Sequence, residues 1–417
     1  MNSRRKSRPE KLSSLTWTAY LVWALSLIFI FYVYLIQSSV FAVASSEMIG
    51  MGRELIPFNL AIVLFQLPVA LLLDKIGPRR VTSIFIFVIG LASLLLSQSR
   101  SVAAIWWSVF LVGAGGAATI VNIFKLVSNW FSPKRFTIML AWTFFALVVG
   151  VPICQIVFHE LLNLFEWPEI TFTYGLFGIL FAILFFALVR DSHAPLRPPK
   201  KFNFKRSVKK ALSRKENYLL ALFCGLVFTQ WFAFYGIWHT QFYQDMYLLK
   251  ASDARLLNFA PICSFAIGVV FFLYVAFYLK KRKVFMMSGL IVAIILSLCT
   301  FYIKEMSLGV HVVLDCIIAF SISTSTLVYT LIYEKNLPTI AATVIGMLQI
   351  FLAFFKLIGE RLILFIIEMT TRHKPSFTSI SGESFQSALI VVPFSLIAAF
   401  IVLIFIKETY GKQVYEE

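Results

Sequence analysis

The sequence predicts an all-α membrane protein with twelve transmembrane helices in two pseudo-symmetric six-helix bundles. Apolar residues make up 60% of the 417 residues and charged residues only 14%, whereas about a quarter of the residues are charged in an ordinary soluble domain. Most apolar runs are long enough to cross roughly 30 Å of hydrocarbon as an α-helix. A basic stretch at residues 190–217 separates two groups of six such runs.

The first group forms the N-terminal bundle, residues 17–189, and follows a polar tail at residues 1–16. Its helices are expected near 17–37, 55–73, 81–99, 101–124, 136–158 and 170–189. The run from Trp17 to Gln37 is too long for the apolar region of a signal peptide, so we interpret it as the first membrane helix.

The second group repeats this plan in residues 218–406, with a tail at 407–417. Its helices are expected near 218–238, 256–279, 284–303, 308–331, 340–366 and 384–406. The stretch between the bundles holds ten Lys or Arg and three prolines between Arg190 and Lys215. We interpret it as a cytoplasmic linker, part of which could lie on the membrane as a basic helix.

The net charge of +17 would suggest a nucleic-acid partner in a soluble protein. Here most Lys and Arg fall in the N-terminal tail, in alternate loops and in the C-terminal tail, which is the distribution that places those segments in the cytoplasm. We therefore expect both termini to be cytoplasmic and no nucleic-acid partner. The five cysteines lie in apolar runs and the five histidines lack metal-ligand spacing, so no metal, cofactor or enzymatic activity is predicted.

A charged turn follows the second helix. Lys75, Arg79 and Arg80 mark it as cytoplasmic, and Gly77 allows the tight reversal. Asp74 is costly at the end of an apolar helix unless it meets a cation or a helix N-terminus. The sequence therefore predicts a partner for Asp74 elsewhere in the chain.

The run from Ala70 to Arg80 resembles the loop between helices 2 and 3 of the major facilitator superfamily, G-x-L-a-D-r-x-G-r-r, with Ala70 in place of the first Gly. Further resemblances lie in Lys125–Phe136, in Glu334–Pro338 with the following Gly346, and in Lys407–Tyr410. Together these segments are similar to nutrient permeases of bacteria that live in host vacuoles, including the phagosomal transporter family.

The resemblance implies that Asp74 helps to latch the cytoplasmic ends of the two halves in the outward-open state. A helix that opens after Pro338 would present free backbone N–H groups and a positive dipole end to a carboxylate. We predict that Asp74 approaches residues 336–342 in one state.

The resemblance also implies a substrate site between the halves, near mid-membrane. In helix 11, Lys356 and Glu360 share a face, and Gln349 lies two turns before Lys356. Lys356 could attract an anion while Glu360 releases it or carries a proton. The alternatives are an ion pair with no ligand and charges that reach outward to the interface.

Other candidates lie in helices 1, 7 and 10. Tyr34 and Gln37 share one face of helix 1, and Gln230 and Trp238 are the expected substrate contacts of helix 7. Asp315 could carry a proton if it is buried, because burial disfavours the charged form. An exposed Asp near the outer surface is the alternative.

Two positions depart from familiar patterns of the superfamily. Val109 stands where helix 4 often has Arg, and Gly150-Val151-Pro152 replaces the glycine-rich helix 5 pattern of drug/proton antiporters. These departures argue against a proton-coupling mechanism that depends on this Arg, and against multidrug export.

The sequence therefore predicts a monomeric secondary transporter in the bacterial inner membrane, working by alternating access. The expected substrate is a small polar solute of the amino-acid or organic-anion class. Proton-linked import is favoured. The alternatives are an exporter of a siderophore or other metabolite and a non-transporting sensor or scaffold.

Overall fold

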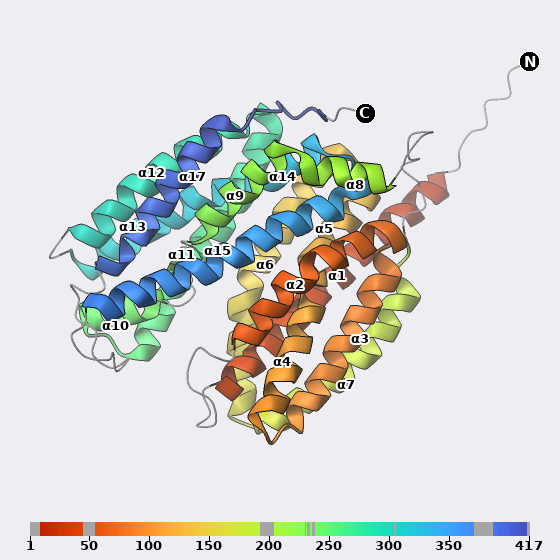
Figure 1. Ribbon diagram of the computed structural model, residues 1–417, viewed down its shortest axis with the longest axis horizontal. Helices are drawn as coiled ribbons and strands as arrows, with labels where there is room; N and C mark the ends of the chain where they lie inside the picture. The colour runs from red at the N-terminus through yellow and green to blue at the C-terminus, as the bar shows by residue number, and fades with distance from the viewer. Residues whose placement is uncertain are drawn as a thin grey trace, which may run out of the picture.

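The computed structural model describes residues 9–44, 55–191, 204–229, 231, 234–235, 238–303, 306–370 and 387–414. Within these ranges the chain forms helices and connecting turns, and no strand. Two helical bundles converge at the end of the molecule that carries α8 and the end of α17, and they splay apart toward the opposite end (Figure 1). We call the convergent end the linker end.

The N-terminal bundle is formed by the first seven helices. They are α1 (Pro9–Ala44), α2 (Leu55–Ile76), α3 (Pro78–Ser97), α4 (Val102–Gly116), α5 (Ala118–Trp130), α6 (Pro133–Leu162) and α7 (Trp167–Leu188). The predicted fourth helix is thus divided into α4 and α5 at Ala117. Close packing explains the glycines just before this break: a Cβ on Gly113 would lie 2.4 Å from the carbonyl oxygen of Phe58 in α2.

The short linker helix α8 (Phe204–Ser213) precedes the C-terminal bundle. The elements of this bundle are α9 (Lys215–Thr229), α10 (His239–Tyr247), α11 (Ala251–Leu279), α12 (Lys283–Tyr302), α13 (Leu308–Ile322), η2 (Ser323–Thr326), α14 (Leu327–Lys335), η3 (Pro338–Ile340), α15 (Ala341–Thr370) and α17 (Val391–Phe405). The predicted helix 10 is the succession of α13, η2 and α14. The predicted helix 7 corresponds to α9 and α10, and α10 ends nine residues beyond the expected end at Trp238.

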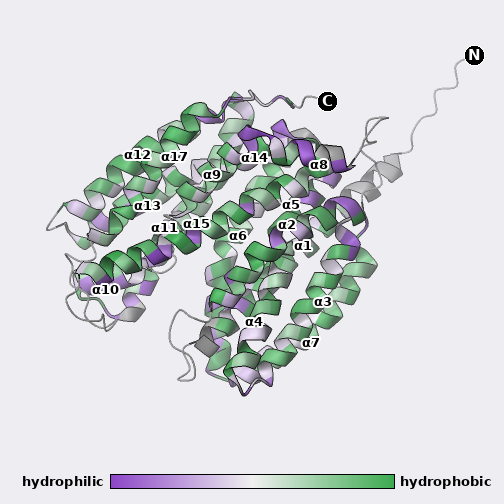
Figure 2. Ribbon diagram, in the orientation of Figure 1, coloured by the Kyte–Doolittle hydropathy of each residue, from purple (hydrophilic) through white to green (hydrophobic). Residues whose placement is uncertain are grey.

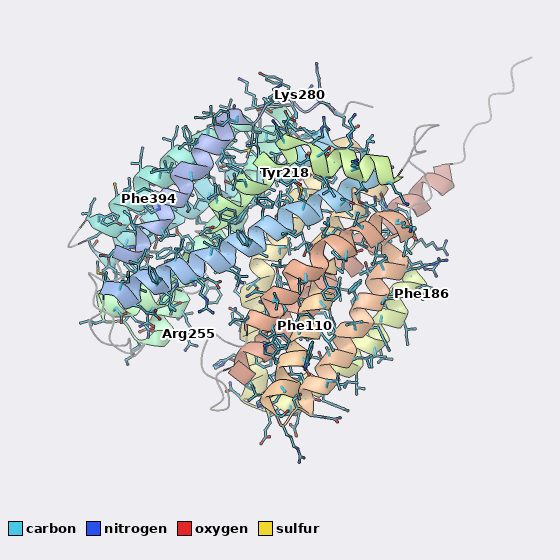
Figure 3. All side chains as sticks on the ribbon, in the orientation of Figure 1. Phe110, Phe186, Tyr218, Arg255, Lys280 and Phe394 are labelled. Carbon is cyan, nitrogen blue, oxygen red and sulfur yellow. The ribbon has the colours of Figure 1, made fainter. Side chains whose placement is uncertain are left out.

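The surface of both bundles is suited to lipid. Ten helices in the described part of the chain are long and apolar enough to cross a membrane. Hydrophobic residues cover the long helices, whereas hydrophilic residues gather at α8 and at helix ends (Figure 2). Phe186 on α7 and Phe394 on α17 are 46% and 65% exposed and project from opposite sides of the molecule (Figure 3). Exposed aromatic side chains are favourable there only if hydrocarbon surrounds them.

In each bundle, a carboxylate at the linker end binds a helix N-terminus of the same bundle. Asp191, just after α7, accepts a hydrogen bond from the backbone N–H of Arg79 in α3 (3.1 Å). Glu408, just after α17, accepts from the backbone N–H groups of Arg282 and Lys283 at the start of α12 (both 2.7 Å). The basic cluster at 280–283 has no acid in its own loop, and Glu408 supplies one from the end of the chain.

Candidate functional site

Asp74 connects the two bundles at the linker end. Its side chain is fully buried and accepts hydrogen bonds from the backbone N–H groups of Ala342 (3.2 Å) and Thr343 (2.7 Å) and from the Thr343 hydroxyl (2.7 Å). These groups lie in the first turn of α15, where the free N–H groups and the helix dipole favour an anion. The predicted approach of Asp74 to residues 336–342 is confirmed by the contact with Ala342.

Lys125, at the end of the fourth membrane helix, completes this contact. Its Nζ lies 2.7 Å from Asp74 Oδ1 and donates to the carbonyl oxygens of Pro338 (3.0 Å) and Thr339 (3.1 Å). An ammonium group has three N–H donors and a carboxylate about four acceptor positions. Both groups are therefore fully hydrogen-bonded, which is the condition under which a buried ion pair is tolerated.

The backbones of α2 and α15 pass very close to each other beside this ion pair. A Cβ on Gly346 would lie 2.5 Å from the Ala70 Cβ and 3.2 Å from the Gln66 carbonyl oxygen. Ala70 occupies the position at which the superfamily loop usually has Gly. The glycine on the facing helix provides the space for the Ala70 methyl group.

Aromatic side chains close the same end between α14 and the N-terminal bundle. Tyr333 stacks on Phe136 of α6, with ring centroids 3.8 Å apart. One turn earlier, Tyr329 stacks on Phe124 of α5 at 4.9 Å and packs on Phe144 of α6 at 4.8 Å. We call these pairs, together with Asp74, Lys125 and the start of α15, the linker-end gate.

The other residues of the predicted gating loop contact their own bundle or lie at the surface. Arg79 donates from Nε to the Phe186 carbonyl oxygen (2.7 Å) and lies over the Phe186 ring. Gly77 has a φ of 104°, in the region that favours glycine. Lys75 and Arg80 are exposed. Within this loop, only Asp74 is seen to bind the other bundle.

One predicted substrate residue of α15, Gln349, contacts the linker-end gate, and two predicted residues of α1, Tyr34 and Gln37, are half-buried. Gln349 of α15 donates from Nε2 to the Tyr329 hydroxyl (3.2 Å), and Tyr34 of α1 is half-buried. Gln37, one turn after Tyr34, is half-buried. Tyr329, which also stacks on Phe124 of α5, thus brings together side chains from both bundles.

Lys356 and Glu360 lie further along α15, on the shared face that the spacing predicts. Lys356 Nζ lies 3.9 Å from Glu360 Oε1, and the two side chains are 22% and 20% exposed. This distance exceeds that of a hydrogen bond, and Glu360 Oε1 has no hydrogen-bond partner among the described residues. Arg361, the next residue, is exposed.

Trp238 of helix 7 is not assembled with this group. Trp238 is buried in a separate aromatic cluster with Phe234, Phe242 and Tyr243. Gln230 lies outside the described residues. The backbone of Trp231 and Trp238 is π-helical, a conformation that is frequent at functional sites.

Asp315 is fully buried in this second cluster, so its carboxylate is not at the outer surface. Oδ2 accepts a hydrogen bond from the Tyr243 hydroxyl (2.7 Å) and lies 3.0 Å from His239 Nε2 and 3.8 Å from His311 Nε2. The sequence offered one signal for part of this arrangement, because His311 and Asp315 are four residues apart and share a helix face. Nothing in the spacing predicted His239.

Comparisons with known proteins identify the family to which the chain belongs. The profile of the Major Facilitator Superfamily matches residues 12–360. A structure of the transporter FucP in the outward conformation superposes with a TM-score of 0.65 and 12% identity, covering 94% of this chain and 100% of that one. At this identity the likeness shows the fold alone.

Two relatives in Escherichia coli (strain K12) are named as transporters of sugar acids. A probable galactarate/D-glucarate transporter, GudP, is 27% identical over 168 residues, which are 36% of this chain and 36% of that protein. A probable L-galactonate transporter is 24% identical over 264 residues, 57% of each chain. The chain thus spans between about a third and three fifths of the length of these relatives.

The profile covers most of the chain, and the superposition extends over both bundles. This agrees with the predicted fold and with the absence of an enzymatic role. The chain belongs to the Major Facilitator Superfamily of membrane transporters.

Proposed function

We propose that this protein transports a small organic anion of the sugar-acid class by alternating access, and that the conformation described is outward-facing. The observation that carries this proposal is the linker-end gate. Asp74 and Lys125 use all their hydrogen-bonding positions on contacts that include the other bundle, so this end is closed. The bundles diverge toward the other end (Figure 1).

We assign the linker end to the cytoplasm of a bacterium, with the chain in the inner membrane. Support comes from the basic residues of α8, where Lys205, Lys209 and Lys210 are exposed. Lys and Arg in short loops favour the cytoplasmic side. A closed linker end then means that substrate reaches the site from outside, which fits import.

The sugar-acid class is favoured over amino acids for two reasons. The relatives described above are named as probable transporters of galactarate, D-glucarate or L-galactonate, which carry carboxylates and hydroxyl groups. In this chain, Lys356 supplies a half-buried cation, and Gln349, Tyr34 and Gln37 supply hydrogen-bonding groups.

Within this site, a substrate carboxylate competes with Glu360 for Lys356. Lys356 Nζ lies 3.9 Å from Glu360 Oε1, beyond hydrogen-bond distance, so a substrate carboxylate can form a shorter contact with Lys356 than Glu360 does. Hydrogen bonds to charged groups contribute about 1.5–3 kcal/mol each. Loss of Lys356 is therefore expected to reduce anion transport by roughly ten- to a hundredfold.

Uptake by proteoliposomes tests this proposal. Radiolabelled D-glucarate, galactarate and L-galactonate would be offered beside glucose and a panel of amino acids. We expect flux of at least one sugar acid and loss of that flux in Lys356→Ala. Arg361→Ala is the matched control, because Arg361 is an exposed cation on the same helix.

Two results would contradict the proposal at different levels. Wild-type flux in Lys356→Ala would remove this residue from the site. A folded, inserted protein that moves amino acids or glucose but none of the three acids would overturn the substrate class.

A further inference from the structure

We propose that Asp315, His239 and His311 form the site at which this transporter binds its coupling proton. The site lies between α10 and α13, at the end of the C-terminal bundle opposite the linker end (Figure 1). The inference rests on the proposed transport function and deepens it, because it assigns the proton to a group of side chains.

The first step is the burial of a carboxylate without a permanent cation. The side chains of Asp315 and His239 are 0% exposed and that of His311 is 1% exposed. In the described part of the chain, no Lys or Arg lies within ion-pair distance of Asp315. An isolated charge in a membrane interior is strongly unfavourable. With two neutral imidazoles the cluster carries one negative charge, and one added proton makes it neutral.

The second step is the tautomer of His311. The Tyr247 hydroxyl donates to the Met306 carbonyl oxygen (3.0 Å) and lies 2.9 Å from His311 Nδ1. A hydroxyl has one proton, so when it is donated to Met306 the Tyr247 oxygen accepts from His311 Nδ1–H. In that tautomer a neutral His311 has no proton on Nε2, the atom that lies 3.8 Å from Asp315 Oδ2.

The third step is the presence of positions that could hold the added proton. Asp315 Oδ1, His239 Nδ1 and His311 Nε2 are buried, and none of the three has a hydrogen-bond partner among the residues described. Buried polar atoms are nearly always paired. Each of these three atoms is a place where one carboxylate–imidazole cluster can accept a proton.

In the part of the chain that the structure describes, the titratable groups that interact with Asp315, besides the two histidines, are tyrosines and a cysteine. From α10 they are Tyr243 and Tyr247, and Tyr235 precedes that helix. Cys316 lies on α13 itself. From α11, the uncharged Asn258 donates to the Tyr235 carbonyl oxygen (3.1 Å) and Ser264 donates to the Cys316 carbonyl oxygen (2.7 Å).

The position of the cluster gives the proton a conformational effect. His239 and Tyr243 belong to α10, the second segment of helix 7, which follows a π-helical stretch. Both bind Asp315 of α13, and the Tyr235 hydroxyl donates to the Asp315 carbonyl oxygen (3.3 Å). Uptake or release of the proton changes the strength of these contacts, because an ionised carboxylate accepts hydrogen bonds more strongly than a neutral one. We therefore expect the protonation state to bias the position of the second segment of helix 7 relative to α13.

A titration without substrate tests the proton site. Infrared difference spectra of the purified protein in lipid nanodiscs would be recorded between about pH 4 and pH 9, following carboxyl and imidazole bands. We expect wild-type protein to bind one proton that Asp315→Asn does not bind. Asp245→Asn is the matched control, because Asp245 is a half-buried carboxylate on α10 that binds Gln241. Titrations of wild type and Asp315→Asn that coincide would overturn the proposal.

A transport measurement tests the coupling. With D-glucarate as the probe, an inward pH gradient should drive accumulation in wild-type proteoliposomes. Asp315→Asn should lose that accumulation and still exchange internal for external D-glucarate. His311→Gln should weaken accumulation, whereas His159→Gln, at an exposed position on α6, should not. Gradient-driven accumulation by Asp315→Asn at the wild-type level would overturn the coupling role.

The two measurements separate this inference from the function on which it rests. If wild-type protein moves no sugar acid, the substrate class is wrong and the infrared titration alone decides the proton site.

Discussion

Single residues decide how the linker end closes, because a buried charge requires a complete set of partners. Asp74 receives three hydrogen bonds from the start of α15 and an ion pair from Lys125. Removing one partner of a buried, hydrogen-bonded ion pair typically costs 3–5 kcal/mol. Asp74 and Lys125 belong to the same bundle, so the part of this cost that is specific to the state in which the two bundles meet comes from the three hydrogen bonds from α15.

The substitution Asp74→Asn is therefore expected to destabilise the outward-facing state rather than the fold. The amide provides one acceptor oxygen and places an NH₂ group beside the donors of α15 and Lys125. Turnover should fall more than substrate affinity. Spin labels on the two bundles at the linker end should report a population with a longer separation.

Asp191→Asn is the control for this prediction. Asp191 is a carboxylate at the same end, and it accepts a hydrogen bond from the backbone N–H of Arg79 in its own bundle. Its substitution should leave the distance between the bundles unchanged. Unaltered turnover and unaltered distances in Asp74→Asn would remove the latch role.

Part of the linker-end gate could be predicted from the sequence. Asp74 required a partner, and the free N–H groups after Pro338 were predicted to supply it. The role of Lys125 was not predicted, because a Lys at the end of an apolar helix is equally compatible with reaching the interface. For Asp315 the sequence left burial and exposure open, since one carboxylate in an apolar run does not reveal which residues of distant helices surround it.

At the scale of helices, the contact between α2 and α15 depends on a pair of small residues. The Gly346→Ala substitution places a methyl group 2.5 Å from the Ala70 Cβ, far inside van der Waals contact. Overpacking of this kind costs roughly 1–3 kcal/mol. We expect a shift toward the inward-facing state, measured as easier modification of a cysteine introduced into the gate.

The compensating substitution makes this prediction specific. Ala70→Gly removes the methyl group that Gly346→Ala meets, so the double variant should return toward the wild-type population. If the double variant is as shifted as the single one, contact with the Gln66 backbone rather than with Ala70 limits the approach of the two helices.

Helix positions followed from apolar length, whereas breaks within helices did not. The predicted fourth helix is divided at Ala117 and the tenth passes through η2, because small residues there allow neighbouring helices to approach closely. Helix 7 continues as α10 to Tyr247. The aromatic cluster around Trp238 buries part of that segment.

At the scale of the whole molecule, the distribution of charge predicts the orientation in the membrane. Both chain ends should be cytoplasmic, so green fluorescent protein fused after the last residue should fluoresce and alkaline phosphatase at the same position should be inactive. A fusion within residues 371–386, between helices 11 and 12, should give the opposite result. The reverse pattern of activities would invert the assignment of the linker end.

Substrate identity could not be obtained from the sequence for a physical reason. Lys356 and Gln349 lie in α15 and Tyr34 lies in α1, far apart along the chain, and their chemistry suits several polar anions. The sugar-acid class that we propose comes from the names of the relatives. Tyr329 contacts Gln349 of α15 and Phe124 of α5, and so joins both bundles at the linker-end limit of the proposed substrate site.

The contacts of Asp191 with α3 and of Glu408 with α12 have a consequence for assembly. In each bundle, an acidic residue of that bundle joins its last membrane helix to its third, so this contact does not depend on the other bundle. A gene cut within residues 192–203 should therefore yield two polypeptides that fold separately, meet in the bilayer and restore a working carrier when they are produced together.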